Sequence, residues 1–101
     1  MNEIAELSEL QENAQKATSL LKVMANEWRL LILCHLAQEE HNVTDLENKL
    51  GLSQSALSQH LALLRSKKLV KTRRSAQSII YSLDSEDVKA LMETLYERFC
   101  A

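Results

Sequence analysis

Proline is absent from this 101-residue chain, and Gly51 is its only glycine. Because these two residues usually interrupt regular structure at loops and tight turns, their scarcity favours helices joined by short connections. No apolar run approaches the ~20 residues that a membrane-spanning helix needs, and the acidic, amphipathic N-terminal stretch lacks the features of a signal or transit peptide. We therefore expect one cytoplasmic domain over residues 1–101, with no membrane partner.

Cysteine is also scarce, and the two that are present, Cys34 and Cys100, form no Cys-x-x-Cys pair. A permanent disulfide is not expected in a reducing cytosol, so composition leaves two interpretations open, a pair of buried structural thiols or a transient redox pair. Metal sites need clustered Cys, His or carboxylate ligands, whereas the three histidines are scattered, so we expect no metal and no other cofactor. No thiol has a recognisable orienting partner, so we do not expect an enzyme.

Acidic residues are missing from residues 48–83, although the whole chain holds fourteen of them and has a net charge of -2. The same segment holds seven of the twelve cations, namely Lys49, Arg65, Lys67, Lys68, Lys71, Arg73 and Arg74. Such segregation of charge favours a polyanionic partner on the basic side. The alternative is a basic helix face that is simply solvated, and the surrounding elements decide between the two.

Amphipathic patterns lie at both ends of the chain. Apolar residues recur every three or four positions over residues 4–24, which predicts a first helix. Asn26 is expected to cap a second helix that is apolar on most sides and therefore central. Ser85 is expected to cap a closing helix whose apolar stripe is longer than a small monomer needs to cover. We therefore predict a homodimer that pairs through helices over about residues 5–24 and 85–100.

The middle of the chain predicts a helix-turn-helix. Thr44 and Glu47 form a capping-box pattern for a short third helix, which ends at Gly51 in a left-handed C-cap. Ser53 is then expected to cap a fourth helix over residues 54–67. Two helices joined by a short turn that contains glycine predict a helix-turn-helix over about residues 44–67.

A β-hairpin is predicted next. Residues 69–74 alternate loosely, residues 78–83 are rich in β-forming residues, and Ser75-Ala76-Gln77 is the short connection. A ribbon directly after a helix-turn-helix is the layout of a winged helix-turn-helix, with the wing over about residues 69–83. The predicted fold is therefore mainly α with a small β-hairpin, in the order ααααββα.

The fourth predicted helix presents short polar side chains at its exposed start. Gln can pair bidentately with adenine and Ser can bond several base edges in the major groove, although a polar solvent face is the alternative. Cations at the helix end and on the ribbon are expected to meet phosphate or the minor groove, and His60 makes either a packing or a phosphate contact. The predicted DNA-binding residues are Gln54, Ser55, Ser58, Gln59, His60, Arg65, Lys67, Lys68, Lys71, Arg73 and Arg74.

The stretch LSQSALSQHLALLRSKKLV, with KTRRSAQSIIYSL after it, resembles the recognition helix and wing of ArsR/SmtB-type bacterial repressors. MANEWRLLIL resembles the segment that precedes them in that family, and the resemblance covers about residues 15–100. It implies a dimeric winged helix repressor and an inducer that lowers its affinity for an inverted-repeat operator in double-stranded DNA. A glycine is common at the wing tip of the family, where this chain has Ser75-Ala76.

The positions of the two cysteines resemble the dithiol subgroup of that family, which includes biofilm growth-associated repressors, sulfide-responsive repressors and haemolysin regulators. The resemblance implies redox sensing by Cys34 and Cys100, which reactive sulfur species or an oxidant would join by a disulfide or polysulfide bridge within one subunit. Cys100 follows a helix end, whose dipole disfavours a thiolate, so we expect Cys34 to attack first unless a cation such as Arg29 or Arg98 lies close to one thiol.

Two alternative functions stay open at this point. One is a metal-responsive repressor of the same fold, although the family's metal positions on the third and final helices carry no clustered Cys or His here. The other is a winged helix module that binds proteins and not DNA. The operator, the target genes, the choice between persulfide and peroxide, and the sign of regulation are also open.

Overall fold

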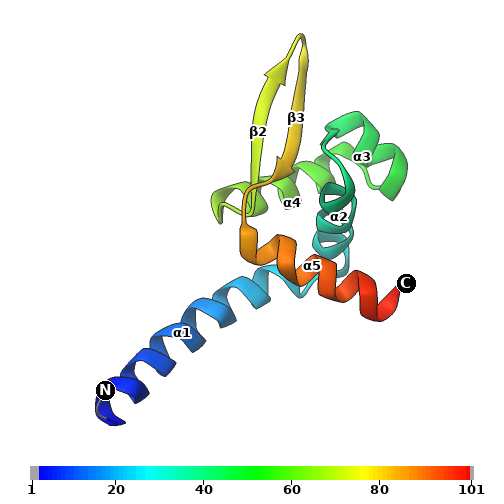
Figure 1. Ribbon diagram of the computed structural model, residues 1–101. Coiled ribbons are helices and arrows are strands. Elements are labelled where there is room, and N and C mark those ends of the chain that lie inside the picture. The colour runs from blue at the N-terminus through cyan, green and yellow to red at the C-terminus, as the bar shows by residue number, and fades with distance from the viewer. Residues whose placement is uncertain (1–2, 101) are drawn as a thin grey trace.

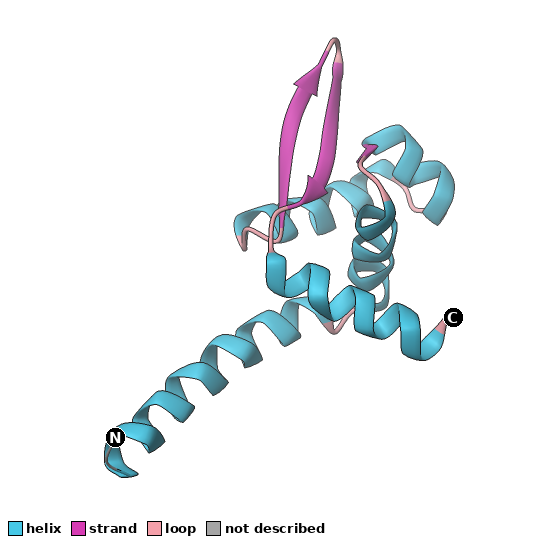
Figure 2. Ribbon diagram, in the orientation of Figure 1, coloured by secondary structure: helices cyan, strands magenta, loops and turns pink. Residues whose placement is uncertain are grey.

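The computed structural model describes residues 3–100, with side chains described from residue 6 onward. Its elements are α1 (Glu3–Met24), α2 (Glu27–Gln38), β1 (His41–Asn42), α3 (Val43–Leu50), α4 (Gln54–Ser66), β2 (Val70–Ser75), β3 (Ser78–Leu83) and α5 (Glu86–Phe99). α3 and α4 form a helix-turn-helix, and β2 and β3 form a long hairpin that projects as the wing (Figure 1). The predicted fold is confirmed, with β1 as an additional short strand (Figure 2).

α2 lies at the centre of the fold, where it contacts α1, α3, α4, α5 and β3. Its Ile32 and Leu33 have no exposed surface, as expected for a helix that is apolar on most sides. The same core takes in Leu46 from α3, Leu57, Leu61 and Leu64 from α4, and Val88 and Met92 from α5. Burial of each such side chain contributes about 1.5–3 kcal/mol to folding, so this core fixes the base of the wing and the orientation of α4.

The sheet has the antiparallel order β1-β3-β2. Within the wing, Val70 pairs with Leu83, Thr72 with Tyr81, and Arg74 with Ile79. β1 adds only His41 and Asn42, which pair with Tyr81 and Ile80. Two residues are too few to show a period of two, which is why the sequence did not predict this strand.

Most of the predicted helix caps are confirmed. The side chains of Asn26, Ser53 and Ser85 accept hydrogen bonds from the backbone N–H groups three residues later. Gly51 ends α3 with φ of 69° and ψ of 21°, the left-handed conformation that glycine adopts without steric cost. These caps determine where α4 begins and therefore which of its residues lie at an exposed helix end.

The predicted capping box at Thr44 is wrong. Asn42 caps α3, because its Oδ1 accepts a hydrogen bond from the N–H of Asp45 at 2.8 Å. Thr44 instead lies inside the first turn and is exposed. Asn is at least as good an N-cap as Thr, and the helix therefore begins at Val43, ahead of the predicted start.

The wing tip is a two-residue turn of Ala76 and Gln77 between the paired Ser75 and Ser78. Ala76 has φ of 55°, in the left-handed region that an L-residue with a Cβ atom enters at a cost of about 1–2 kcal/mol. This is the part of the wing where the resemblance leads one to expect glycine. The conformation is therefore kept even though the residue that normally favours it is absent.

α1 extends away from the rest of the chain, which gives the molecule a long axis of 54 Å against 30 and 21 Å (Figure 1). Every side chain from residue 6 to residue 19 is exposed. Within the described part of the chain, none of the helices combines the length and apolar character needed to span a bilayer.

Candidate nucleic-acid interface and thiol site

The exposed face of α4 carries the polar residues that the sequence singled out. Gln54, Ser55, Ser58 and Gln59 are exposed, while Leu57 and Leu61 on the opposite face are fully or almost fully buried. The hydroxyl of Ser53 accepts the N–H of Ala56 at 3.2 Å, so the first turn is capped. The remaining free amides of this turn and the helix dipole favour an anion nearby.

His60 lies at the flank of α4 and is half-buried. Among the described residues its ring forms no hydrogen bond or ion pair. Its predicted role therefore stays a prediction.

An open hollow of about 360 Å³ separates α4 from the wing and is lined by Ser58, Ala62, Arg65, Ser66 and Tyr81. Because residues that pair across antiparallel strands point to the same side of a sheet, the wing face that carries Tyr81 also carries Thr72, Arg74 and Ile79. The face of the wing that bears Arg74 therefore adjoins the exposed face of α4.

Three exposed cations, Arg65, Lys67 and Lys68, lie at the end of α4. Together with Arg74 they form no ion pair with any side chain described for residues 6–100. The charge of these four side chains is thus available to a phosphate backbone without breaking an internal ion pair.

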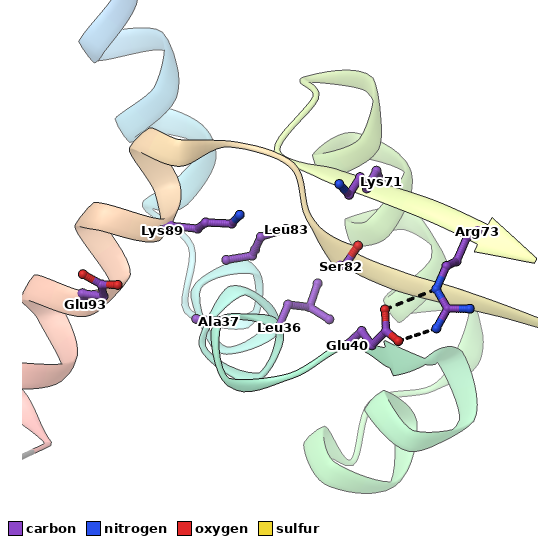
Figure 3. A pocket seen from close by; sticks show the side chains of 9 residues that line it. All are labelled: Leu36, Ala37, Glu40, Lys71, Arg73, Ser82, Leu83, Lys89 and Glu93. Carbon is purple, nitrogen blue, oxygen red and sulfur yellow. Dashed lines mark hydrogen bonds and ion pairs between the residues drawn. The ribbon is translucent and has the colours of Figure 1, made fainter.

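Lys71 and Arg73 lie on the other face of the wing, since they alternate with Thr72 and Arg74 along β2. The Nζ of Lys71 is 4.0 Å from Oδ1 of Asp84. Arg73 donates from Nε to Oε2 of Glu40 at 3.3 Å and from Nη2 to Oε1 of Glu40 (Figure 3). Both cations are therefore partnered by carboxylates, which the sequence did not reveal.

The pairing of Arg73 with Glu40 also changes the ionisation of both groups. The hydrogen bonds from Arg73, followed by its charge, lower the pKa of the Glu40 carboxyl. The same contacts raise the pKa of Arg73, so both groups are charged at neutral pH. Glu40 is a residue that sequence reasoning missed, because a contact between residues 33 positions apart has no local signal.

Cys34 and Cys100 come together at the crossing of α2 and α5. Both line an apolar cavity of about 500 Å³, whose other walls include Leu31, Met92 and Tyr96. Cys34 is half-buried, Cys100 is exposed, and neither forms a disulfide. The packing of the last helix on the second, which a bridge between the two thiols requires, is therefore present.

Burial, followed by the nearby Cys100, raises the pKa of the Cys34 thiol. His35 lines the same cavity, and its pKa is lowered by burial, then by His41 and Lys49. The two shifts favour a neutral thiol beside a neutral imidazole over a thiolate–imidazolium pair. The expectation that Cys34 attacks first gains no support from these shifts, because a raised pKa lowers the thiolate fraction.

No group of three or more His, Cys, Asp or Glu residues is arranged to hold a metal ion within the described residues. His35 and His41 contact each other edge to face, with ring centroids 6.1 Å apart. His35 lines the thiol cavity and His41 lies in β1, and no third ligand joins them among the residues that the structure describes.

Comparisons with known proteins agree with this geometry. Residues 26–72 match the family model described as bacterial regulatory protein, arsR family. The chain is 53% identical over 94 residues to the transcriptional activator HlyU of Vibrio cholerae serotype O1, covering 93% of this chain and 87% of that protein. It is 42% identical over 95 residues to the biofilm growth-associated repressor of Agrobacterium fabrum, covering 94% and 81%. The solved structure of reduced HlyU from Vibrio cholerae superimposes with a TM-score of 0.89 at 53% identity, covering 92% of this chain and 98% of that one.

Proposed function

The chain belongs to the ArsR family of bacterial transcriptional regulators, and we propose that chemistry at Cys34 and Cys100 controls its binding to an inverted-repeat operator. As a DNA-binding regulator it would act in the cytoplasm, where bacterial DNA lies. The observation that carries the thiol proposal is the shared cavity, because it is lined by both cysteines, one from the second helix and one from the end of the last.

The DNA contacts divide into two kinds. The exposed start of α4, with Gln54, Ser55, Ser58 and Gln59, would enter the major groove and read base edges. Arg65, Lys67 and Lys68 would contact the phosphate backbone, with Arg74 reaching phosphate or the minor groove. His60, Lys71 and Arg73 are candidates for additional backbone contacts.

Pairing of two copies would cover the apolar face of α1 and the end of α5. Leu7, Leu10 and Leu21 on α1 and Tyr96 and Phe99 on α5 are all more than half exposed. An isolated helix of this kind is marginal in water, and most helices gain their stability from tertiary packing, so a partner for α1 is expected. A two-fold dimer would place two copies of α4 about 34 Å apart, on successive major grooves of an inverted repeat.

Oxidation at the cavity would join α2 to α5 within one subunit. Peroxide would form the direct disulfide, taking up two electrons and both thiol protons to give two waters. A low-molecular-weight persulfide would transfer its outer sulfur to one thiol and leave as a thiol. Closing that adduct into a trisulfide releases two electrons and two protons, which a second persulfide accepts as it splits into a thiol and hydrogen sulfide. Either bridge would constrain the helices that set the spacing of the two α4 helices, and altered spacing costs operator affinity.

The test combines mass spectrometry with a DNA-binding assay on one sample. The protein is treated with peroxide or with glutathione persulfide, and the fraction bridged between Cys34 and Cys100 is compared with operator affinity. We expect affinity to fall in proportion to bridging, and expect Cys34→Ser and Cys100→Ser to remain bound under the same treatment. Complete bridging with unchanged affinity would refute the proposal.

A further inference from the structure

The contact between Glu40 and Arg73 joins the wing to the segment between α2 and β1 (Figure 3). Arg73 pairs with Ile80 across the wing, and Ile80 pairs in turn with Asn42 on β1. Glu40 directly precedes β1, so it reaches Arg73 across β3, the strand that lies between β1 and β2. Two hydrogen bonds from one guanidinium to one carboxylate form the bidentate geometry, which is the strongest arrangement of an ion pair. Both side chains keep about half of their surface exposed, at 56% for Arg73 and 45% for Glu40.

The two other cations around this contact are engaged elsewhere. Lys71, Lys89 and Glu93 line the same cavity of about 540 Å³ between α2, α5 and the wing. Lys71 is closest to Asp84, and Lys89 donates to Glu86 at 3.2 Å. Among the cations that line this cavity, Arg73 is therefore the one that forms an ion pair with Glu40.

Bound to Glu40, Arg73 is a poor phosphate ligand for two reasons. Its Nε and Nη2 groups already donate to the carboxylate, so a phosphate that needs the same fork has to displace it. The carboxylate also adds a negative charge that repels the DNA backbone. Exposure of both groups makes such an exchange feasible, because solvent and salt screen the pair and a phosphate can reach the guanidinium.

We propose that Glu40 is a positioning residue that withholds Arg73 from DNA, so that the wing binds duplex more weakly than its cations allow. The inference rests on the DNA-binding function proposed above and adds a residue that limits affinity. Because phosphate contacts carry no sequence information, the limit applies equally to operator and random duplex.

The test is Glu40→Gln, with Glu39→Gln as the matched control that removes the same charge one residue away. Dissociation constants for operator and random duplex are measured by fluorescence anisotropy over a range of salt concentrations. One released arginine steepens the fall of log affinity with log salt by about 0.9. The gain in affinity of the variant over wild type should therefore be roughly eightfold larger at 0.1 M than at 1 M salt. We expect this gain for Glu40→Gln on both duplexes, a change of less than about twofold for Glu39→Gln, and no gain for Glu40→Gln combined with Arg73→Gln.

Three DNA-binding results would overturn the inference. They are binding by Glu40→Gln that is unchanged or weaker, an equal gain in Glu39→Gln, or a gain that persists without Arg73. The pair itself is tested in DNA-free protein by titrating the Glu40 carboxyl with NMR, where Arg73→Gln should raise its pKa. An unchanged pKa would also overturn the inference, whereas a wild-type protein that binds no duplex at all would refute the proposed function itself.

Discussion

Cys34 on α2 and Cys100 at the end of α5 line the same apolar cavity, although they lie in the second and the last helical segments of the chain. The first thiol is half-buried and the second is exposed, so a reagent in solvent reaches them unequally. Accessibility and acidity therefore oppose an early reaction at Cys34, since burial also raises its pKa. In the proposed redox mechanism, the exposed Cys100 would therefore react first with an oxidant or persulfide, and Cys34 would resolve the adduct.

The pH dependence of alkylation tests this assignment. In the Cys100→Ser variant, the rate of iodoacetamide reaction at Cys34 should rise with pH and reach its midpoint above that of an unfolded cysteine, because burial disfavours the thiolate. The measurement is the rate of adduct formation by mass spectrometry, with the urea-unfolded variant as the control. A folded midpoint at or below the unfolded one would contradict the raised pKa.

Base reading and backbone contact should separate in two variants of α4. Gln59→Ala should weaken operator binding by about 1–3 kcal/mol and leave random duplex unchanged, because a side chain in the groove senses base edges. Arg65→Ala should weaken both duplexes by the same factor and lower the salt slope by about 0.9. The operator for this comparison comes from selection on a random duplex library. Matching losses on both duplexes in both variants would refute the division.

The strained turn at the wing tip predicts a stabilising substitution. Ala76→Gly removes the Cβ that disfavours φ of 55°, and part of that gain is offset by the greater freedom of glycine in the unfolded chain. We expect a net increase of about 0.5–1 kcal/mol in the free energy of unfolding, measured by urea denaturation. Ser75→Gly is the control, because it places glycine in a paired strand position and should destabilise by a similar amount. A loss of stability in Ala76→Gly would show that the turn relaxes in solution.

Local signals explain which parts of this fold could be predicted from the sequence. Side-chain caps and the left-handed glycine act within three or four residues, so Asn26, Gly51, Ser53 and Ser85 were identified correctly. The error at Thr44 arose because local signals alone could not choose between two good capping residues. Asn42 and Thr44 are both good caps, and the pairing of Asn42 with Ile80 in the distant wing helps to decide in favour of Asn42.

Long-range contacts explain what the sequence could not predict. The charge of residues 48–83 correctly marked a basic segment, but the carboxylates that neutralise Lys71 and Arg73 come from Asp84 and Glu40, outside that segment. Strand alternation separates these two cations from Arg74, which lies on the face next to α4. A count of charges along the chain therefore overstated the number of cations that are available to DNA.

The exposed apolar face of α1 predicts a dimer that pairs through this helix. A single charged residue introduced on this face should dissociate the dimer. Leu10 is 63% exposed in the single chain, and burying a carboxylate in its place would cost roughly 3 kcal/mol over the two copies of a symmetric interface, or about a hundredfold in dimer affinity. We expect Leu10→Glu to sediment as a monomer at micromolar concentration and to bind operator more weakly, because each half-site then binds separately. Ser8→Glu adds the same charge on the opposite side of the helix and should stay dimeric. A wild-type protein that sediments as a monomer, or a Leu10→Glu variant that stays dimeric, would show that α1 does not pair two copies.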